Sequence, residues 1–572
     1  MKFRWSLAPP QPLLAEPLVR QFNLSPLLAQ CLLNRGLSEP PAITEYLEPR
    51  LKNLADPFLL PNMTAAVERL YAARDKNEPL VIFGDYDVDG VTSTALLTEV
   101  LRALGWTVSH YLPHRMEEGY GLSQDGVENC LKKFPVTLLL AVDCGSTAVA
   151  AIDWLRQQGV DVLVLDHHQI SSPAPAAAAL VNPQLNTTGD CRFQKLCSAG
   201  LAFKLAHALI KKGRELGIEA ARNFDVRPLL DLVALGTVAD LVPLRGENRI
   251  LAAMGLERLG VTPRPGLVAL KNVAQITGDI GVHETGFQLA PRLNAAGRIE
   301  NAEEALHLLM APDLATAEPI ARNLDLRNRE RQKIERGIAT EVIGSLRARF
   351  NPQTDFVIVE GQLLWHIGVV GIVASRVLQQ FYRPTIIVGG DGSEWRGSGR
   401  SIAGFDMAAA LRECSDLLVR HGGHAMAAGV TIRADNLNEF RTRLNDLARR
   451  TLKPEELQPS LRLDAEVALK EITVDRLDEL TRLEPVGQGN PPVQLVARKL
   501  TQARPLQRIG TEKQHVKLWV TDGKITHETV WWGAGRETAL PVGHFDLAFA
   551  PQINAYNNRR SVQLKLLDWQ LA

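Results

Sequence analysis

Short, uninterrupted apolar runs recur through the first half of the chain. They span residues 79–83, 136–142 and 161–165, and they are rich in leucine and β-branched residues without polar alternation. That pattern is typical of strands buried on both faces. Helix-forming stretches at 92–105 and 148–159 separate the runs. The order predicts an α/β fold with a parallel sheet covered by helices on both faces.

The rest of the chain divides into blocks with other patterns. Residues 1–75 predict short helices broken by prolines, and 325–350 is a long run of strong helix formers that we expect to connect two lobes. New apolar runs at 355–360 and 384–390 predict a second α/β unit. The stretch SSPAPAAAAL at 171–180 is predicted to be a loop.

Short alternating segments near the C-terminus predict a small β-barrel. They cover 515–522, 527–533, 544–556 and 560–569. Polar and apolar positions alternate along each of them, as in strands with one buried face.

Composition narrows the class of protein. Lys plus Arg and Asp plus Glu both number 64, so the formal net charge is zero, and 45% of the residues are hydrophobic. Disorder of the whole chain is excluded, and so is a protein that coats DNA through a large excess of basic residues. A local basic groove remains compatible with this balance.

The six cysteines form no C-x-x-C pair, which argues against a disulfide framework or a zinc ribbon. We expect free thiols in a reducing compartment. Because no apolar run approaches the roughly 18 residues that span a bilayer, we expect a cytoplasmic protein without membrane association.

Three carboxylates crowd together directly after the first apolar run. Asp85, Asp87 and Asp89 precede Gly90, where a helix is expected to begin. Ligands bind at the carboxyl ends of strands in open α/β sheets, and like charges this close must be solvated or neutralised by a cation. The alternative is an ordinary acidic loop or a helix N-terminus capped by aspartates.

The next two apolar runs end in related side chains. Asp143 follows the second run, and Asp166, His167 and His168 follow the third. A lone buried histidine is usually a core residue, but two in tandem beside an aspartate at a strand end favour a site. Asp240 lies in an otherwise apolar stretch, where an unpaired carboxylate would cost several kcal/mol.

Carboxylates mixed with imidazole suit Mn²⁺ or Mg²⁺, and the number of carboxylates predicts two divalent cations. Two ions about 3.5–4 Å apart can share a bridging carboxylate and stabilise the attacking and leaving oxygens of a phosphate ester. The predicted chemistry is phosphoester hydrolysis.

These motifs resemble, in order and spacing, the four motifs of the DHH phosphoesterase superfamily. They read D-Y-D-V-D-G, V-D-C-G, D-H-H and A-D-L-V-P in this chain. Segments 291–306, 397–407 and 421–432 are similar to the DHH-associated substrate-binding domain, and the C-terminal module is similar to an oligonucleotide-binding (OB) barrel.

The resemblance implies a role for each motif residue. It implies metal ligands at Asp87, Asp89, Asp143, His167 and Asp240, with Asp143 bridging two ions. It further implies that His168 faces the scissile phosphate, with Asp85 and Asp166 as orienting groups. The pyrophosphatases of this superfamily have a histidine where this chain has Phe83, so the resemblance favours the exonuclease branch, with fewer protein ligands on the first ion.

Phosphate-binding residues are expected in the second lobe and beside the metals. The candidates are Asn294, Arg298, Ser375, Arg376, Arg400, Ser401, Gly422, Gly423 and His424. The glycine pair before His424 could expose backbone N–H groups to phosphate, and the alternative is a tight glycine turn. In the barrel, candidates for base stacking are Trp519, Trp531, Trp532, Tyr556 and Trp569, of which we expect one or two to face solvent. Arg559 and Arg560 on a predicted hairpin turn are electrostatic candidates.

Five domains follow from the pattern and the resemblance together. They are a helical extension (1–75), a DHH domain (76–310), a connecting helix (311–350), a DHH-associated domain (351–455) and an OB-like barrel (459–572).

The resemblance implies an exonuclease specific for single-stranded DNA that proceeds from the 5′ end, releases mononucleotides and serves recombination and repair. The implied partners are a single-strand-binding protein and a repair helicase, and we expect a monomer. Two alternatives stay open: an enzyme acting on small nucleotides, whose relatives lack the barrel, and a catalytically inactive DNA-binding subunit. Deletion of 459–572 tests the first alternative, and Asp143→Ala tests the second.

Overall fold

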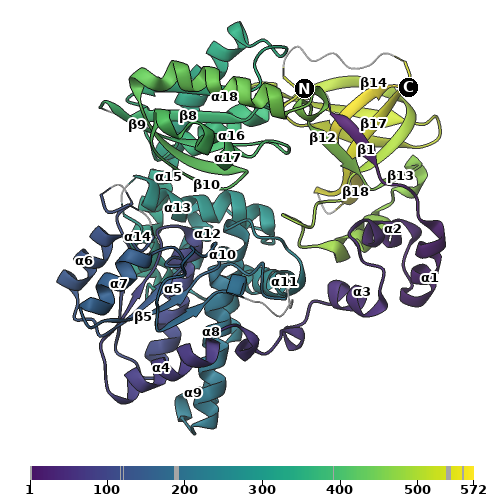
Figure 1. The fold of residues 1–572 in the computed structure, drawn as a ribbon. Coiled ribbons are helices and arrows are strands. Elements are labelled where there is room, and N and C mark those ends of the chain that lie inside the picture. The colour runs from purple at the N-terminus through teal and green to yellow at the C-terminus, as the bar shows by residue number, and fades with distance from the viewer. Residues whose placement is uncertain are drawn as a thin grey trace. The chain divides into compact units, whose positions relative to one another are not determined.

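The computed structural model describes residues 3–115, 117–119, 121–185, 192–299, 301–390, 392–535, 543–556 and 559–572, with Ile299 and Tyr556 described by their backbone alone. The chain forms two compact units (Figure 1). The first, called the carboxylate unit here, comprises 39–329 and 483–491. The second, called the barrel unit, comprises 1–38, 330–482 and 492–572.

A five-stranded parallel sheet forms the centre of the carboxylate unit, with strand order β3-β2-β4-β5-β6. The strands are β2 (Leu80–Phe83), β3 (Val108–Tyr111), β4 (Leu138–Val142), β5 (Asp161–Leu165) and β6 (Ala179–Val181). The three predicted strands are confirmed as β2, β4 and β5, and they are direct neighbours. Their carboxyl ends therefore meet at one edge, as the sequence predicts.

Two strands of this sheet, β3 and β6, were not predicted. Strand β3 contains Ser109 and His110 at half-buried positions, so it lacks a continuous apolar run. Strand β6 lies at the end of the stretch predicted as a loop, and its three residues are buried against β5. The prediction of a loop throughout 171–180 is therefore wrong for Ala179 and Leu180.

Helices cover both faces of this sheet (Figure 1). One face is covered by α4 (Met63–Asp75), α5 (Val88–Ala103), α8 (Ser198–Glu215) and α10 (Leu230–Ala239), and the other by α6 (Gln124–Lys133) and α7 (Val149–Gln157). Alternate residues of β2 separate the faces: Leu80 and Ile82 contact the first set of helices, and Val81 and Phe83 the second. The predicted doubly covered parallel sheet is confirmed.

Further helices complete the unit and lead out of it. They are α3 (Pro40–Leu47), α9 (Glu219–Asn223), α11 (Gly246–Gly260), α12 (Pro265–Val273), the π-helix η5 (Glu284–Leu289), α13 (Ala290–Ile299) and α14 (Glu303–Leu309). The predicted connecting helix is confirmed as α15 (Leu314–Arg349), whose residues belong to both units.

The barrel unit contains a second α/β sheet, with strand order β10-β11-β9-β8-β7. Its strands are β7 (Ile358–Leu363), β8 (Thr385–Gly390), β9 (Glu394–Arg400), β10 (Leu418–Gly423) and β11 (Ala427–Arg433). The packed helices are α16 (Val370–Phe381), α17 (Met407–Glu413) and α18 (Leu437–Thr451). Only β7 and β8 pair in parallel, as expected for a strand–helix–strand unit extended by antiparallel strands.

The predicted C-terminal barrel is confirmed as a closed sheet. Its strands are β14 (Leu495–Ile509), β15 (His515–Thr521), β16 (Thr526–Trp531), β17 (Phe545–Tyr556) and β18 (Arg559–Leu571). Strands β14 and β17 pair with each other and close the ring, which removes the free sheet edges. Strand β14 was not predicted, since its sequence is highly polar and its pairing is interrupted by register shifts.

The first residues of the chain also belong to the barrel unit. Strand β1 (Arg4–Leu7) pairs in parallel with β12 (Ser460–Leu463), and β13 (Ala465–Glu466) pairs with β14. Helices α1 (Pro12–Phe22), α2 (Pro26–Asn34) and α19 (Val474–Leu480) complete the unit. No described helix is both long and apolar enough to span a membrane. Five cysteines are buried and free, as predicted, and Cys191 lies outside the described residues.

Candidate functional site

The acidic and imidazole side chains after β2, β4 and β5 converge at the carboxyl edge of the sheet. Three groups have ligand atoms within 4.8 Å of one another: Asp85, Asp87 and Asp143; Asp89, His167 and Asp240; and Asp143, His167 and His168. All eight residues of the four motifs except Asp166 belong to at least one group. The structure therefore brings the predicted metal ligands together.

Asp87 is also the N-cap of α5. Its Oδ1 accepts hydrogen bonds from the backbone N–H groups of Asp89 (2.9 Å) and Gly90 (3.2 Å). The alternative of a capping aspartate thus holds for this residue. Because its carboxylate also lies among Asp85 and Asp143, capping fixes its orientation within the cluster.

Asp89 is held by the N-terminus of α8. Its two carboxylate oxygens accept hydrogen bonds from the backbone N–H groups of Ser198 and Ala199, each at 2.7 Å. The partial positive charge of a helix N-terminus favours a carboxylate there by up to about 2 kcal/mol. A side chain that is 1% exposed is thereby kept in place.

Asp143 occupies the centre of the cluster in a strained backbone conformation. Its φ angle is +63°, a left-handed conformation that costs a non-glycine residue about 1–3 kcal/mol and is concentrated at functional sites. Its Oδ1 accepts a hydrogen bond from Ser198 Oγ at 2.8 Å. The strained backbone conformation therefore directs the Asp143 carboxylate toward the other ligand atoms of the cluster.

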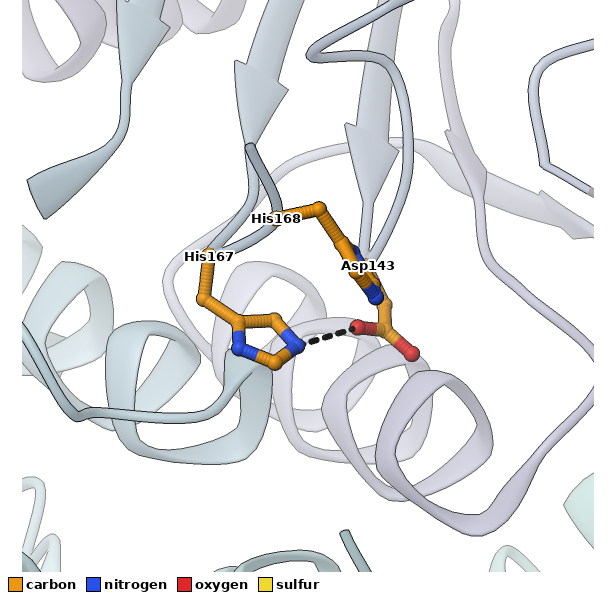
Figure 2. A group of neighbouring side chains, drawn as sticks. All are labelled: Asp143, His167 and His168. Carbon is orange, nitrogen blue, oxygen red and sulfur yellow. Dashed lines mark ion pairs between the residues drawn. The ribbon is translucent and has the colours of Figure 1, made fainter. Parts of the chain in front are cut away.

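His167 faces three carboxylates. Its Nε2 lies 3.4 Å from Asp143 Oδ1, 3.6 Å from Asp240 Oδ2 and 3.9 Å from Asp89 Oδ2. Figure 2 shows the ring of His167 turned toward Asp143 across the ends of β5 and β4. The Nε2 atom is buried and makes no hydrogen bond within the described residues. Burial lowers the pKa of His167 to about 4, so the ring is neutral near pH 7 and can act as a ligand.

His168 is oriented by Asp166. Asp166 Oδ1 lies 2.7 Å from His168 Nδ1 and also accepts the backbone N–H groups of His167 and His168. Burial opposes charge on both groups, but their mutual interaction outweighs it: the pKa of His168 rises to about 9, and the pKa of Asp166 falls well below its usual value. His168 therefore carries a proton near neutral pH, with Nε2 as its remaining donor.

The remaining carboxylates are destabilised as anions by burial and by one another. Burial, followed by the neighbouring negative charges, raises the pKa of Asp85 to about 7, of Asp89 to about 6 and of Asp240 to about 9, and it raises the pKa of Asp143 strongly. Such a cluster ionises fully only with added positive charge. A buried imidazole nitrogen without a hydrogen bond in the described part of the chain, aimed at carboxylate oxygens, fits divalent cations with oxygen and nitrogen ligands.

The candidate phosphate-binding residues of the carboxylate unit lie beside this cluster. Asn294 Oδ1 accepts a hydrogen bond from the backbone N–H of Val88, next to Asp87 and Asp89, at 3.2 Å. Arg298 lies close enough to Tyr86 to act on its hydroxyl. Burial raises the pKa of Tyr86 to about 12, and the positive charges of Arg115 and Arg298 partly oppose this rise. Helix α13 thus places Asn294 and Arg298 beside residues 85–89, called the aspartate loop here.

Candidates around α16 in the barrel unit are partly engaged within the fold. Arg376 Nε forms an ion pair with Glu335 on α15, and Ser375 Oγ donates to the Gly371 carbonyl. Arg400 donates to Ser398 Oγ and to its neighbour's carbonyl, while the buried Ser401 hydroxyl donates to the Phe405 carbonyl at 2.7 Å. These contacts hold the four side chains in place.

The glycine pair before His424 lies at the end of β10. Gly422 and Gly423 are in register with Gly429 and Ala428 of β11, and the His424 N–H donates to the Ala427 carbonyl at 2.8 Å. The two glycines thus belong to a strand that pairs with β11, rather than to the glycine turn that was the alternative interpretation, and His424 itself is exposed. Binding of phosphate at this turn stays a prediction.

The barrel aromatic residues differ in exposure. Trp532 is 49% exposed and stands edge-on to His515 at 4.8 Å between ring centroids. Trp519, Trp531 and Trp569 are partly buried, and the side chain of Tyr556 lies outside the described residues. The two candidate arginines, Arg559 and Arg560, begin strand β18, and Arg560 pairs with Asp478.

Three supporting residues were not predicted. Ser198 binds Asp143, and Asn182 donates to both Ser146 Oγ and the His168 carbonyl at 2.8 Å. The Ser146 N–H donates in turn to Asp166. For Ser198 the only signal in the sequence is its place at the start of an apolar helix, so tertiary structure alone reveals its role.

Family models match three segments of the chain: the N-terminal domain of the DHH family at 79–237, the DHHA1 domain at 354–450 and the RecJ OB domain at 463–568. The single-stranded-DNA-specific exonuclease RecJ of Bacillus subtilis (strain 168) is 38% identical, over all of this chain and 72% of that protein. Its counterpart from Dickeya dadantii (strain 3937) is 37% identical over 95% of each. The chain belongs to the RecJ family.

Solved RecJ structures agree with the computed fold. RecJ from Thermus thermophilus in complex with Mn²⁺ matches with a TM-score of 0.84 and 30% identity, covering 100% of this chain and 80% of that one. The same protein with Mg²⁺ matches with a TM-score of 0.79 and 28% identity, over 100% and 78%. The RecJ-type order of DHH domain, DHHA1 domain and OB barrel is thus present in this chain.

Proposed function

We propose that this protein is a metal-dependent exonuclease specific for single-stranded DNA, which hydrolyses phosphodiester bonds from the 5′ end. One observation carries the proposal: the complete carboxylate–histidine cluster lies in a chain that is similar to RecJ exonucleases over its whole length. The Mn²⁺ and Mg²⁺ in the RecJ structures support these cations as cofactors.

Asp87, Asp89, Asp143, His167 and Asp240 would hold two divalent cations, with Asp143 shared between them. When bound, the cations would activate a water molecule as the nucleophile and would offset negative charge on the phosphate. His168 donates the proton on its Nε2 to the leaving oxygen, while Asp166 keeps its Nδ1 engaged. Asp85 orients the aspartate loop through its hydrogen bond from the Gly121 N–H.

Substrate binding extends the proposal beyond the cluster. Asn294 and Arg298 would contact the phosphate beside the metals, and Ser375, Arg376, Arg400, Ser401, Gly422, Gly423 and His424 would bind the strand and its 5′ end. The OB barrel would bind single-stranded DNA through exposed groups such as Trp532.

We further propose that the products are mononucleotides and that the enzyme serves recombination and repair. It would act as a cytoplasmic monomer. Its partners would be a single-strand-binding protein and a helicase. Three of the five proposed domain ranges (76–310, 351–455 and 459–572) each contain one family-model match, which supports those three.

The test is a time course of products from 5′- and 3′-labelled single strands and duplexes with Mn²⁺. We expect wild type to release nucleotides first from the 5′ label of single strands and to spare duplexes. Asp143→Ala should lower the rate more than about 100-fold, because loss of mere supporting contacts at metal sites already costs about 10–100-fold. Asp279→Ala, at an exposed aspartate of the same unit, is the control. Release of the 3′ label before the 5′ label, or full activity of Asp143→Ala, would refute the proposal.

A further inference from the structure

Residues 483–491, called the return segment here, follow the barrel unit's helix α19 in sequence but belong to the carboxylate unit. They contact the loop that follows Asp240. The Leu244 N–H donates to the Gln488 carbonyl at 2.8 Å, and Arg245 Nε donates to the Gly489 carbonyl at 2.6 Å. The return segment therefore lies directly on residues 243–245, three positions beyond a member of the carboxylate cluster.

The fit between the two segments requires glycine. Gly489 has φ +70°, and a Cβ atom there would lie 2.8 Å from Pro243 Cβ. A Cβ atom on Gly487 would lie 2.9 Å from Leu244 Cδ1, the end of a flexible side chain that can turn aside, so the requirement for glycine is at Gly489. Contacts this short force a displacement, so any side chain at Gly489 would push the loop away or distort the segment.

The return segment is itself fixed to the carboxylate unit. Asn490 is 1% exposed, donates to the carbonyls of Leu483 and Pro485 at 2.8 Å, and accepts from the Tyr46 hydroxyl at 2.7 Å. The buried guanidinium of Arg249 on α11 donates to the carbonyls of Leu483 and Glu484. The segment is thus a rigid support.

The Asp240 backbone ends helix α10, where its N–H donates to the Gly236 carbonyl at 2.9 Å, but its side chain is less firmly held. Whereas Asp89 and Asp143 accept protein hydrogen bonds, the Asp240 carboxylate accepts none from the described residues. Its side chain is 22% exposed, against 1% and 2% for the other two. Leu241, the next residue, takes a left-handed φ of +58°. Helix α10 therefore fixes the Asp240 backbone from one side, and the loop after Asp240 fixes it from the other.

We propose that the return segment is a positioning element for Asp240, with Gly489 and Arg245 as positioning residues, and that it thereby sets the affinity of the divalent-metal site. The inference rests on the proposed function, in which Asp240 is a metal ligand. Contacts that orient metal ligands typically change metal affinity by about 10–100-fold when removed.

The test compares Gly489→Ala with Gly159→Ala in the full-length protein. Gly159 has φ +78° in the same unit, and a Cβ atom there would have no neighbouring atom within 4 Å, so its variant carries the backbone strain without the contact. Mn²⁺ binding is measured by titration calorimetry, and thermal unfolding is measured without metal. We expect Gly489→Ala to weaken Mn²⁺ binding about 10-fold or more relative to Gly159→Ala, with nuclease activity recovering at higher Mn²⁺.

A second variant decides the question if Gly489→Ala does not fold. Arg245 is exposed, so Arg245→Met removes its hydrogen bond to Gly489 at little risk, and Arg322→Met on the exposed face of α15 is its control. Weaker Mn²⁺ binding in Arg245→Met alone supports the inference. Equal Mn²⁺ binding by the folded variants and their controls overturns it.

Asp240→Ala, measured in parallel, separates this inference from the proposed function. If Asp240→Ala weakens Mn²⁺ binding and the positioning variants do not, only the inference fails. If Asp240→Ala binds Mn²⁺ as wild type does, Asp240 is not a metal ligand, and the inference is then also wrong.

Discussion

Asp87 illustrates how a single side chain in this protein combines two roles. It caps α5 through the N–H groups of Asp89 and Gly90, and it lies in the carboxylate cluster. The sequence left these roles as alternatives, but a cap uses one oxygen and leaves the other free to bind a cation. The motif residues that follow β2, β4 and β5 could be predicted as one site, because the carboxyl ends of parallel strands all lie at the same edge of the sheet.

Ser198 could not be predicted in this way, since it is 55 positions from Asp143 and the two side chains meet only through the tertiary packing of α8. Asn182 and Ser146 are of the same kind. Their roles depend on tertiary contacts that no local pattern encodes.

Ser198→Ala should raise the Mn²⁺ concentration for half-maximal nuclease activity about 10-fold, because Asp143 loses the hydrogen bond that orients it. Ser93→Ala is the matched control: its hydroxyl is buried on α5 and has no hydrogen-bond partner in the described part of the chain. Equal Mn²⁺ dependence of the two variants would contradict the role given to Ser198.

At the scale of elements, burial decided which strands could be predicted. Strands β2, β4 and β5 are buried at nearly every position, so their sequences are continuous apolar runs. Strands β3 and β14 carry polar residues at half-buried and exposed positions and were missed. The pattern of hydrophobic residues predicts a strand only where burial is uniform along its length.

Helices α8 and α11 are joined by a buried ion pair. Lys204 Nζ lies 2.9 Å from Glu247 Oε1 and donates to the Ala55 carbonyl, and Glu247 accepts the Ala55 N–H. Lys204→Met leaves a buried carboxylate without its partner, so we expect a loss of about 3–5 kcal/mol in the free energy of unfolding of the carboxylate unit.

Thermal unfolding followed by calorimetry measures this loss as a lower midpoint temperature. The double variant Lys204→Met/Glu247→Leu should recover most of it, because no unpaired charge remains. If the double variant is as unstable as Lys204→Met, the loss of the ion pair itself causes the instability, and the unpaired Glu247 carboxylate does not.

At the scale of the whole molecule, the sequence indicated the order of the domains but not which segments fold together. Residues 1–38 and 483–491 each join a unit distant in sequence. Strand β1 has no apolar signature that would pair it with β12, and the return segment reads as an ordinary turn. Deletion of 459–572 would therefore remove part of the carboxylate unit along with the barrel, so single substitutions test the barrel more cleanly.

Trp532→Ala should weaken binding of a fluorescent oligodeoxythymidylate, measured by anisotropy in the Asp143→Ala background, which prevents degradation. Stacking on an aromatic side chain contributes about 1–3 kcal/mol per base, so the Kd should rise roughly 5-fold or more. Leu571→Ala, which removes another exposed apolar side chain of the barrel, is the control. An unchanged Kd for Trp532→Ala would assign DNA binding to other residues.

The position of the return segment also bears on how the protein is made. Chains emerge from the ribosome from the N-terminus, and domains tend to fold as soon as their residues are available. The carboxylate unit cannot be completed at residue 329, because its last piece is synthesised only at residues 483–491. A nascent nuclease would thus lack the support for Asp240 until residues 483–491 have been synthesised, which ties maturation of the catalytic edge to translation of a segment that follows much of the barrel unit.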